Sequence, residues 1–133
     1  MQKFSGIALA ISLSITSAPL FAYFDVDPTK SLPNLVPESQ HATASKRITA
    51  QFTRAHYKTV DMNDVLSEQI FERYIKQLDY SRNIFLAEDI KAFEKYAADF
   101  DNMIARGKLS TAYEIYNKNL ERRLERYRYA ITL

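Results

Sequence analysis

The chain has 133 residues, a length that allows one domain at most. It contains no cysteine, which excludes disulfides, thiol catalysis and thiolate metal sites, and its net charge of +2 is too small to indicate a nucleic-acid partner. Two glycines and four prolines leave few helix breakers, so the composition favours long helices.

Residues 1–22 have the layout of a secretory signal peptide. Lys3 precedes an apolar run over residues 4–15, and the helix-breaking Pro19 and the small residue Ala22 follow that run. The alternative is a transmembrane anchor, but several hydroxyl side chains interrupt the run, and about 20 predominantly apolar residues are needed to span a bilayer. The sequence therefore predicts cleavage after Ala22, export, and contact with a membrane only during export.

Residues 23–38 are expected to form an extended linker, because three prolines fall there and few apolar residues recur at a helical spacing. Four helical stretches follow, without a convincing strand. The first helix is predicted over residues 40–58, and its apolar face carries Ala44, Ile48, Phe52 and Ala55.

The second helix is predicted to run from a cap at Asp61 or Asn63 to about Leu78. Its apolar stripe consists of Leu66, Ile70, Phe71, Tyr74 and Leu78. The third helix is predicted to begin near Ala87 and to end at Gly107, a residue suited to a left-handed stop. Its stripe consists of Ile90, Phe93, Ala97, Phe100 and Ile104.

The fourth helix is predicted to start after Ser110, a good N-cap, and to continue to the last residue, Leu133. Its stripe consists of Tyr113, Tyr116, Leu120, Leu124, Tyr127 and Ile131. The sequence thus predicts an all-α fold: a signal helix, a proline-containing lead-in, and about four helices, of which the second to fourth pack as an up-down bundle. The expected core is aromatic and consists of Phe52, Phe71, Tyr74, Phe93, Phe100, Tyr113 and Tyr116.

The stretch LDYSRNIFLAEDI places an acid, a phenol, a hydroxyl and a guanidinium side by side, at Asp79, Tyr80, Ser81 and Arg82. A catalytic reading fails because no histidine is near enough to activate Ser81, and Asp79 alone is too weak a base. We interpret the stretch as the joint between the second and third helices, with Ser81 or Asn83 as turn residues. The end of the bundle is expected to be closed by Tyr80, Ile84 and Phe85.

The two histidines and one acidic group are the other candidate metal ligands. His41 and His56 are fifteen residues apart, whereas a zinc pair on one helix needs a spacing of four, so we expect His56 to be a packing residue and His41 a cap or turn partner. The group Asp99, Asp101 and Asn102 resembles a calcium loop, but it lacks the required glycine and the closing glutamate. We expect these side chains to form a solvated helix face, and we expect Glu88 and Asp89 to complement a helix dipole.

A basic and aromatic cluster ends the chain, and it consists of Arg122, Arg123, Arg126 and Arg128 with Tyr127 and Tyr129. Nucleic acid or anionic lipid could bind such a cluster, but Glu121 and Glu125 interleave with it. We expect the arginines to complement the negative pole of the helix and, in a longer parent protein, to face the following domain. The helical pattern is uninterrupted at Leu133, so the sequence reads as one that is cut before its end.

Three stretches together resemble one family: HATASKRITAQFTRAHYK, IFERYIKQLDYSRNIFLAEDIKAF and GKLSTAYEIYNKNLERRLERYRYA. They are similar to the N-terminal helical domain of the tail-specific (carboxy-terminal processing) proteases of Gram-negative bacteria, over residues 41–130. The resemblance implies that residues 39–133 are that domain, in a periplasmic parent that continues into a PDZ domain and a protease domain with a serine nucleophile and a lysine base. It also implies a lipoprotein adaptor as a possible partner.

None of the catalytic residues of that family falls on this chain, so the resemblance assigns no catalytic residue here, and no cofactor or metal is expected. The first hypothesis is a non-catalytic module that scaffolds the PDZ and protease domains and offers an adaptor surface. The alternative is a free-standing, exported helical interaction protein without protease activity. The two hypotheses differ in whether the reading frame continues past Leu133.

Overall fold

The computed structural model of the chain describes residues 27, 29–55 and 61–133, and these residues contain helices and no strand. The helices are α1 (Ser39–Ala55), α2 (Asp64–Leu78), α3 (Ala87–Glu94), α4 (Phe100–Ala105) and α5 (Ser110–Ala130), with one short 3₁₀ turn, η1 (Ala97–Asp99). The all-α prediction is confirmed for this part of the chain. The predicted signal peptide and the last turn of the predicted first helix lie outside it.

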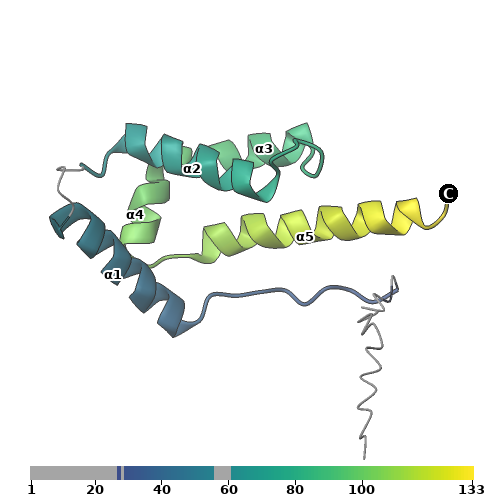
Figure 1. The fold of residues 1–133 in the computed structure, drawn as a ribbon, viewed down its shortest axis with the longest axis horizontal. Helices are drawn as coiled ribbons and strands as arrows, with labels where there is room; N and C mark the ends of the chain where they lie inside the picture. Colours follow the sequence, from purple (N-terminus) through teal and green to yellow (C-terminus); the bar gives the residue numbers. More distant parts are fainter. Residues whose placement is uncertain (1–26, 28, 56–60) are drawn as a thin grey trace, which may run out of the picture.

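The helices form two levels (Figure 1). The antiparallel helices α2 and α3 lie on one level and α5 lies on the other, while α4 joins the two levels and α1 crosses their end. Residues 30–37, called the lead-in below, run in an extended path along α5. None of the helices described is both long enough and apolar enough to cross a bilayer.

The core is small and mostly aromatic. Phe71, Phe93, Phe100 and Ile115 are at most 5% exposed, and Phe71 meets Phe100 edge to face with 5.6 Å between ring centroids. Tyr74 lies over Phe100 and donates a hydrogen bond from its hydroxyl to the carbonyl of Ala112, at 2.8 Å. Burial, together with the neighbouring Tyr116 and Tyr113, raises the pKa of Tyr74 to about 12. The phenol is therefore neutral, and its hydrogen bond joins α2 to α5.

The predicted third helix is broken, because a serine of α2 enters its hydrogen-bond ladder. In a continuous helix the N–H of Asp101 would donate to the carbonyl of Ala97. Here the Asp101 N–H donates to the Ser67 hydroxyl at 3.0 Å, and that hydroxyl donates to the Ala97 carbonyl at 2.5 Å. Ser67 is fully buried, and a side chain inserted into the ladder is a known cause of a sharp helix kink. The chain therefore turns through η1, and α4 leaves the direction of α3.

Two of the predicted helix ends are confirmed. The Asn63 side chain accepts the N–H of Leu66 at 2.9 Å and caps α2. Gly107, at φ +70°, ends α4 with a Schellman pair: its own N–H donates to the carbonyl of Ile104, and the N–H of Lys108 donates to that of Met103.

Two other helix ends differ from the prediction. Ser110 is the first residue of α5 rather than its cap, and the capping position belongs to Leu109, which has no side-chain hydrogen bond. The helix ends at Ala130 instead of continuing to Leu133. The predicted cap is therefore wrong by one residue.

The predicted apolar face of α1 is exposed, and that of α5 is only partly buried. The prediction that Phe52 belongs to the core is wrong, because this residue is 42% exposed. Ile48 is 69% exposed, and α1 packs against α4 through small side chains instead: the Ser45 hydroxyl donates to the carbonyl of Ile104 at 2.6 Å. On α5 the buried side chains are Ile115 and Asn119, neither of which belongs to the predicted stripe. Tyr127, at 41% exposed, lies outside the core. The predicted stripe is therefore wrong for the buried centre of α5, which lies on a neighbouring face of the helix.

Candidate functional site

Asp79 organises the turn between α2 and α3. Its Oδ1 accepts the N–H of Asn83 at 2.8 Å, and its Oδ2 accepts those of Ile84 and Phe85, both at 2.9 Å. Burial raises the pKa of the Asp79 carboxyl, but the three backbone donors and the nearby charge of Arg123 outweigh burial and hold that pKa below its ordinary value. Both carboxylate oxygens therefore have a structural role.

The other side chains of this turn do not join the Asp79 carboxylate. Ser81 is exposed, and in the part of the chain described here its hydroxyl makes no hydrogen bond. Arg82 takes a left-handed backbone conformation, with φ at +53°. Tyr80 is 78% exposed, so the prediction that it closes the end of the bundle is wrong, whereas Phe85 is half-buried and packs edge-on against Phe93. The geometry is that of a helix joint.

Asp89 and Arg122 form a bidentate ion pair that joins α3 to α5. Arg122 Nε lies 2.8 Å from Oδ2, and Nη2 lies 2.9 Å from Oδ1. Asp89 Oδ2 also accepts the N–H of Leu86 at 3.0 Å, as a carboxylate in the first turn of a helix can. The Arg122 guanidinium holds the pKa of Asp89 below its ordinary value, although burial opposes this. The expected dipole complement thus describes only part of the role of Asp89.

Arg123 and Asn119 connect α5 to the end of α2. Arg123 donates to Asn119 Oδ1 at 2.7 Å and to the carbonyl of Leu78 at 3.0 Å, and Asn119 Nδ2 donates to the same carbonyl at 3.2 Å. This pairing satisfies one of the free carbonyls at the C-terminus of α2. The interpretation of the arginine cluster as a complement to its own helix pole is therefore wrong for Arg122 and Arg123, which bind groups of other helices.

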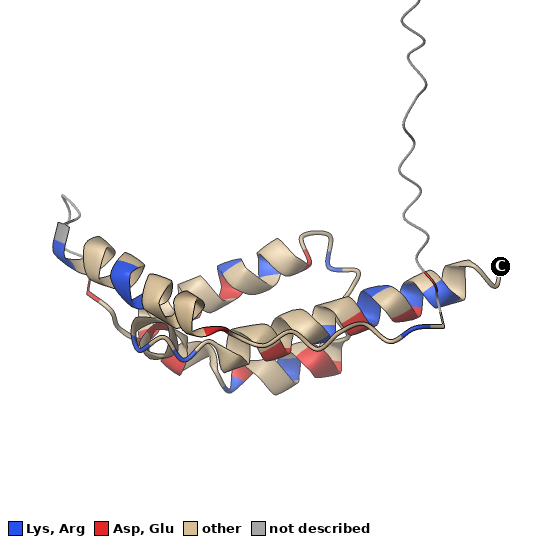
Figure 2. Cartoon of the chain, turned by 90° about the horizontal axis from the view of Figure 1, so that it is seen from below, with Lys and Arg blue, Asp and Glu red and all other residues tan. Residues whose placement is uncertain are grey.

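The last turns of α5 carry the exposed part of the cluster. Basic side chains follow one another there with acidic ones among them (Figure 2). Tyr127, Tyr129 and Ile131 are 41%, 67% and 54% exposed. Arg128 reaches back to the lead-in and donates to the carbonyl of Lys30 at 3.3 Å.

The predicted acidic face is partly wrong, because Asp101 is buried. Asp101 is 2% exposed, and its Oδ1 has no hydrogen-bond partner among the described residues, whereas Asp99 is exposed as expected. The burial of Asp101 follows from the kink, since α4 turns this side chain toward α2. The described residues include no group of three or more histidines and acids that could hold a metal ion.

His41 serves as a turn partner, as predicted. Its Nδ1 accepts the N–H of Glu38 at 3.1 Å and lies 2.9 Å from the Tyr113 hydroxyl, and the two rings stack with 5.9 Å between centroids. The histidine thereby fixes the junction between the lead-in and α1 against the start of α5. His56, expected to be a packing residue, lies outside the described residues.

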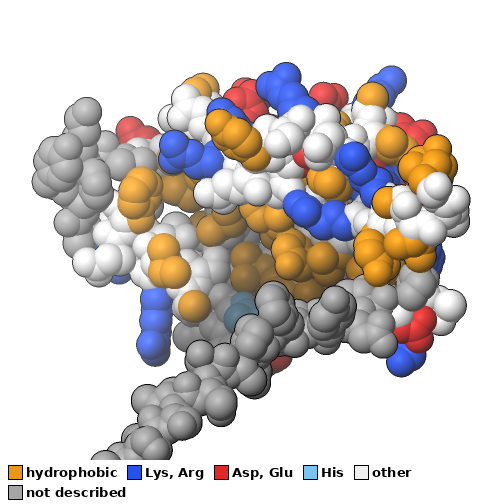
Figure 3. Space-filling view, turned by 45° about the vertical axis from the view of Figure 1, so that its right-hand side comes forward, with side chains coloured by type: hydrophobic (Ala, Val, Ile, Leu, Met, Phe, Trp, Pro, Cys, Tyr) orange, Lys and Arg blue, Asp and Glu red, His pale blue; other side chains and the backbone are white. Residues whose placement is uncertain are grey.

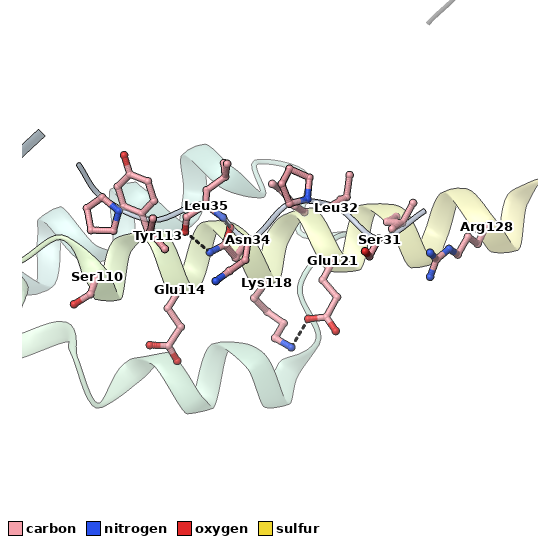
Figure 4. Close-up of a pocket in the computed structure, with 16 residues that line it drawn as sticks. Ser31, Leu32, Asn34, Leu35, Ser110, Tyr113, Glu114, Lys118, Glu121 and Arg128 are labelled. Atoms are coloured by element: carbon pink, nitrogen blue, oxygen red, sulfur yellow. Dashed lines mark hydrogen bonds and ion pairs between the residues drawn. The ribbon is translucent and has the colours of Figure 1, made fainter. Parts of the chain in front are cut away.

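A groove lies between the lead-in and α5 (Figure 4). Its volume is about 620 Å³, and residues 31–37 line one side of it. On α5 the lining side chains recur at steps of three and four, and they include Tyr113, Asn117, Leu124 and Arg128. The sequence-based reading missed Asn117, although a polar residue within the apolar stripe of α5 is an available cue.

A second groove lies between α2 and α3. Phe71, Ile75 and Ile90 contribute its apolar surface, and acidic side chains, Glu68, Glu72 and Glu94, line it as well. Figure 3 shows one face of the molecule, which is hollowed and on which apolar side chains gather among charged ones. Within the described residues, both grooves present apolar surface bordered by polar and charged side chains.

Comparison with known proteins places these features in a family. The family described as "Tail specific protease N-terminal domain" matches residues 48–133. A curated relative, the tail-specific protease of Haemophilus influenzae, is 41% identical over 127 residues, which cover 91% of this chain and 18% of the relative. The chain therefore spans less than a fifth of the length of that relative.

Proposed function

Because the chain belongs to the family of tail-specific protease N-terminal domains, we propose that it is the non-catalytic N-terminal module of a periplasmic serine endopeptidase. In this proposal the module positions the PDZ and protease domains of the parent protein and contributes to the contact with a lipoprotein adaptor. Residues 1–22 direct export and are then removed.

One observation carries the proposal: the similarity to the curated protease covers nearly all of this chain but only 18% of the relative. A protein that shares one domain with a multidomain enzyme is expected to share the role of that domain, and an active site must be argued from its own geometry.

The local chemistry supports a non-catalytic role. A serine nucleophile needs a base within hydrogen-bond reach and a third group that orients the base. The carboxylate nearest in sequence to Ser81 belongs to Asp79, and backbone N–H groups occupy both of its oxygens. Asp89 is likewise engaged by Arg122.

The proposal is tested first on the purified chain. We expect no cleavage of a fluorogenic peptide and no labelling by a serine-reactive fluorophosphonate probe, with a Ser81→Ala variant prepared in parallel as the matched control. Labelling or cleavage that disappears in the Ser81→Ala variant would contradict a non-catalytic role.

The scaffolding role is tested in the intact parent protein. Replacing Arg126 by glutamate reverses a charge on the exposed end of α5 and leaves the internal ion pair of Arg122 in place. We expect slower cleavage of a protein substrate, whereas Lys91→Glu on the exposed side of α3 serves as the charge-matched control. Equal activity of both variants and the parent would show that this end of α5 makes no contact that matters for cleavage.

A further inference from the structure

The lead-in is held on α5 by hydrogen bonds to its backbone rather than to one of its side chains. Asn117 Oδ1 accepts the N–H of Leu35 at 3.0 Å, and Asn117 Nδ2 donates to the carbonyl of the same residue at 2.8 Å. This reciprocal pair is what a residue in an antiparallel sheet receives from the strand beside it. A side-chain amide on a helix therefore takes the place of a neighbouring strand.

The surroundings of Asn117 suit an extended chain. Tyr113 lies one turn before Asn117 on the same face of α5, and Leu120 and Leu124 follow it, so apolar surface flanks the amide on both sides. The segment that lies along this face of α5, SLPNLVP, has no charged side chain over seven residues, and its two prolines favour an extended backbone.

The segment is held at both ends but only lightly between them. His41 fixes the end next to α1, and Arg128 contacts the carbonyl of Lys30 at the other end. Leu32, Leu35 and Val36 remain 42%, 39% and 64% exposed. The segment is therefore only partly buried, and its covalent tether adds a high effective concentration beside α5.

We propose that the face of α5 centred on Asn117 is a binding site for an extended, uncharged polypeptide segment with apolar side chains, and that residues 31–37 occupy this site in cis as a built-in ligand. Recognition depends on one peptide unit that offers both its N–H and its carbonyl to the Asn117 amide. Another polypeptide segment of the same chemistry binds when the built-in segment leaves. This inference does not depend on the protease function proposed above.

The test uses a variant that releases residues 31–37 from this face of α5 without altering α5 itself. In Leu35→Pro the clamped residue loses its N–H, so the built-in segment is released while α5 is unchanged. The probe is the blocked heptapeptide acetyl-SLPNLVP-amide, and binding is followed through the side-chain amide resonances of Asn117 in ¹⁵N-labelled protein. We expect these resonances to shift in a saturable way when the peptide is added to Leu35→Pro, and to shift at least tenfold less strongly, at equal peptide concentration, in the wild-type chain.

Two controls separate backbone recognition from general adhesion. A peptide with an N-methyl group on its fifth residue, the equivalent of Leu35, lacks the donor and is expected not to bind. The double variant Leu35→Pro/Asn117→Asp keeps an acceptor but loses the donor, and we expect it to bind the unmodified peptide weakly, as followed through the backbone amides of α5. Absence of peptide binding to Leu35→Pro, or equal binding of the N-methylated peptide, would overturn the proposal.

Discussion

Replacing Ser67 by alanine removes the hydroxyl that bridges the interrupted helix. Two buried backbone groups, the N–H of Asp101 and the carbonyl of Ala97, then lose their partner. A buried polar group left without a partner costs about 1–3 kcal/mol. Because the ladder can partly close by direct approach of the two groups, we expect the free energy of unfolding to fall by about 2–4 kcal/mol. For a domain of this size, each kcal/mol corresponds to a fall of about 4–8 °C in the melting temperature.

Urea denaturation followed by circular dichroism measures this loss of stability, and hydrogen exchange locates it. We expect the Asp101 amide to exchange much faster in Ser67→Ala than in the wild-type chain, because its acceptor is gone. Ser110→Ala is the control, since Ser110 is exposed and makes no side-chain hydrogen bond at the start of α5. Unchanged stability of Ser67→Ala with a protected Asp101 amide would refute the claim that the hydroxyl supports the kink.

Three further predictions concern single positions, each read from urea denaturation. Arg82→Gly is expected to raise the free energy of unfolding by about 0.5–1 kcal/mol, because φ at +53° is costly for arginine; a decrease would show that the arginine side chain stabilises the turn. Gly107→Ala is expected to lower it by about 1–3 kcal/mol, because a Cβ there would lie 2.8 Å from the carbonyl oxygen of Ala42; a neutral effect would contradict this close approach. The pKa of Asp89 is lowered in the folded chain, so its pair with Arg122 stabilises the fold above the unfolded pKa of about 3.9, and this stability is lost as pH falls through the folded pKa. Stability measured from pH 6 to pH 2 (~4 units) is therefore expected to fall less steeply in Asp89→Asn, and an identical slope would contradict the prediction.

The parts of the fold that the sequence predicted correctly depend on local chemistry. Asn63 caps α2 because its side chain reaches an N–H three residues on, and Gly107 ends α4 because glycine accepts a positive φ. Both features are complete within six residues, so a reading of the sequence alone can find them.

The larger errors involve partners that are distant in the sequence, whereas the two errors at the ends of α5 are local shifts of a helix boundary. The kink after α3 needs a hydroxyl from Ser67, 30 residues before the carbonyl that receives it. The role of Asn117 needs a backbone 82 residues away. The apolar face of α1, which includes Ile48, looked like core by periodicity, but small side chains give the closer fit against α4. Periodicity identifies helices and cannot say which of two faces a neighbouring helix covers.

The contact between Arg128 and Lys30 brings together two positions that are 98 residues apart, so the two ends of the described fold leave the molecule on the same side. The lead-in and α5 run antiparallel from that point, so the contacts between them lie one after another along the direction in which the two segments would separate. A mechanical force that pulls the two ends apart therefore meets one weak contact at a time, and it peels residues 30–37 away before it strains the helical layers. The rest of the fold is thereby shielded from tension on the polypeptide at either end.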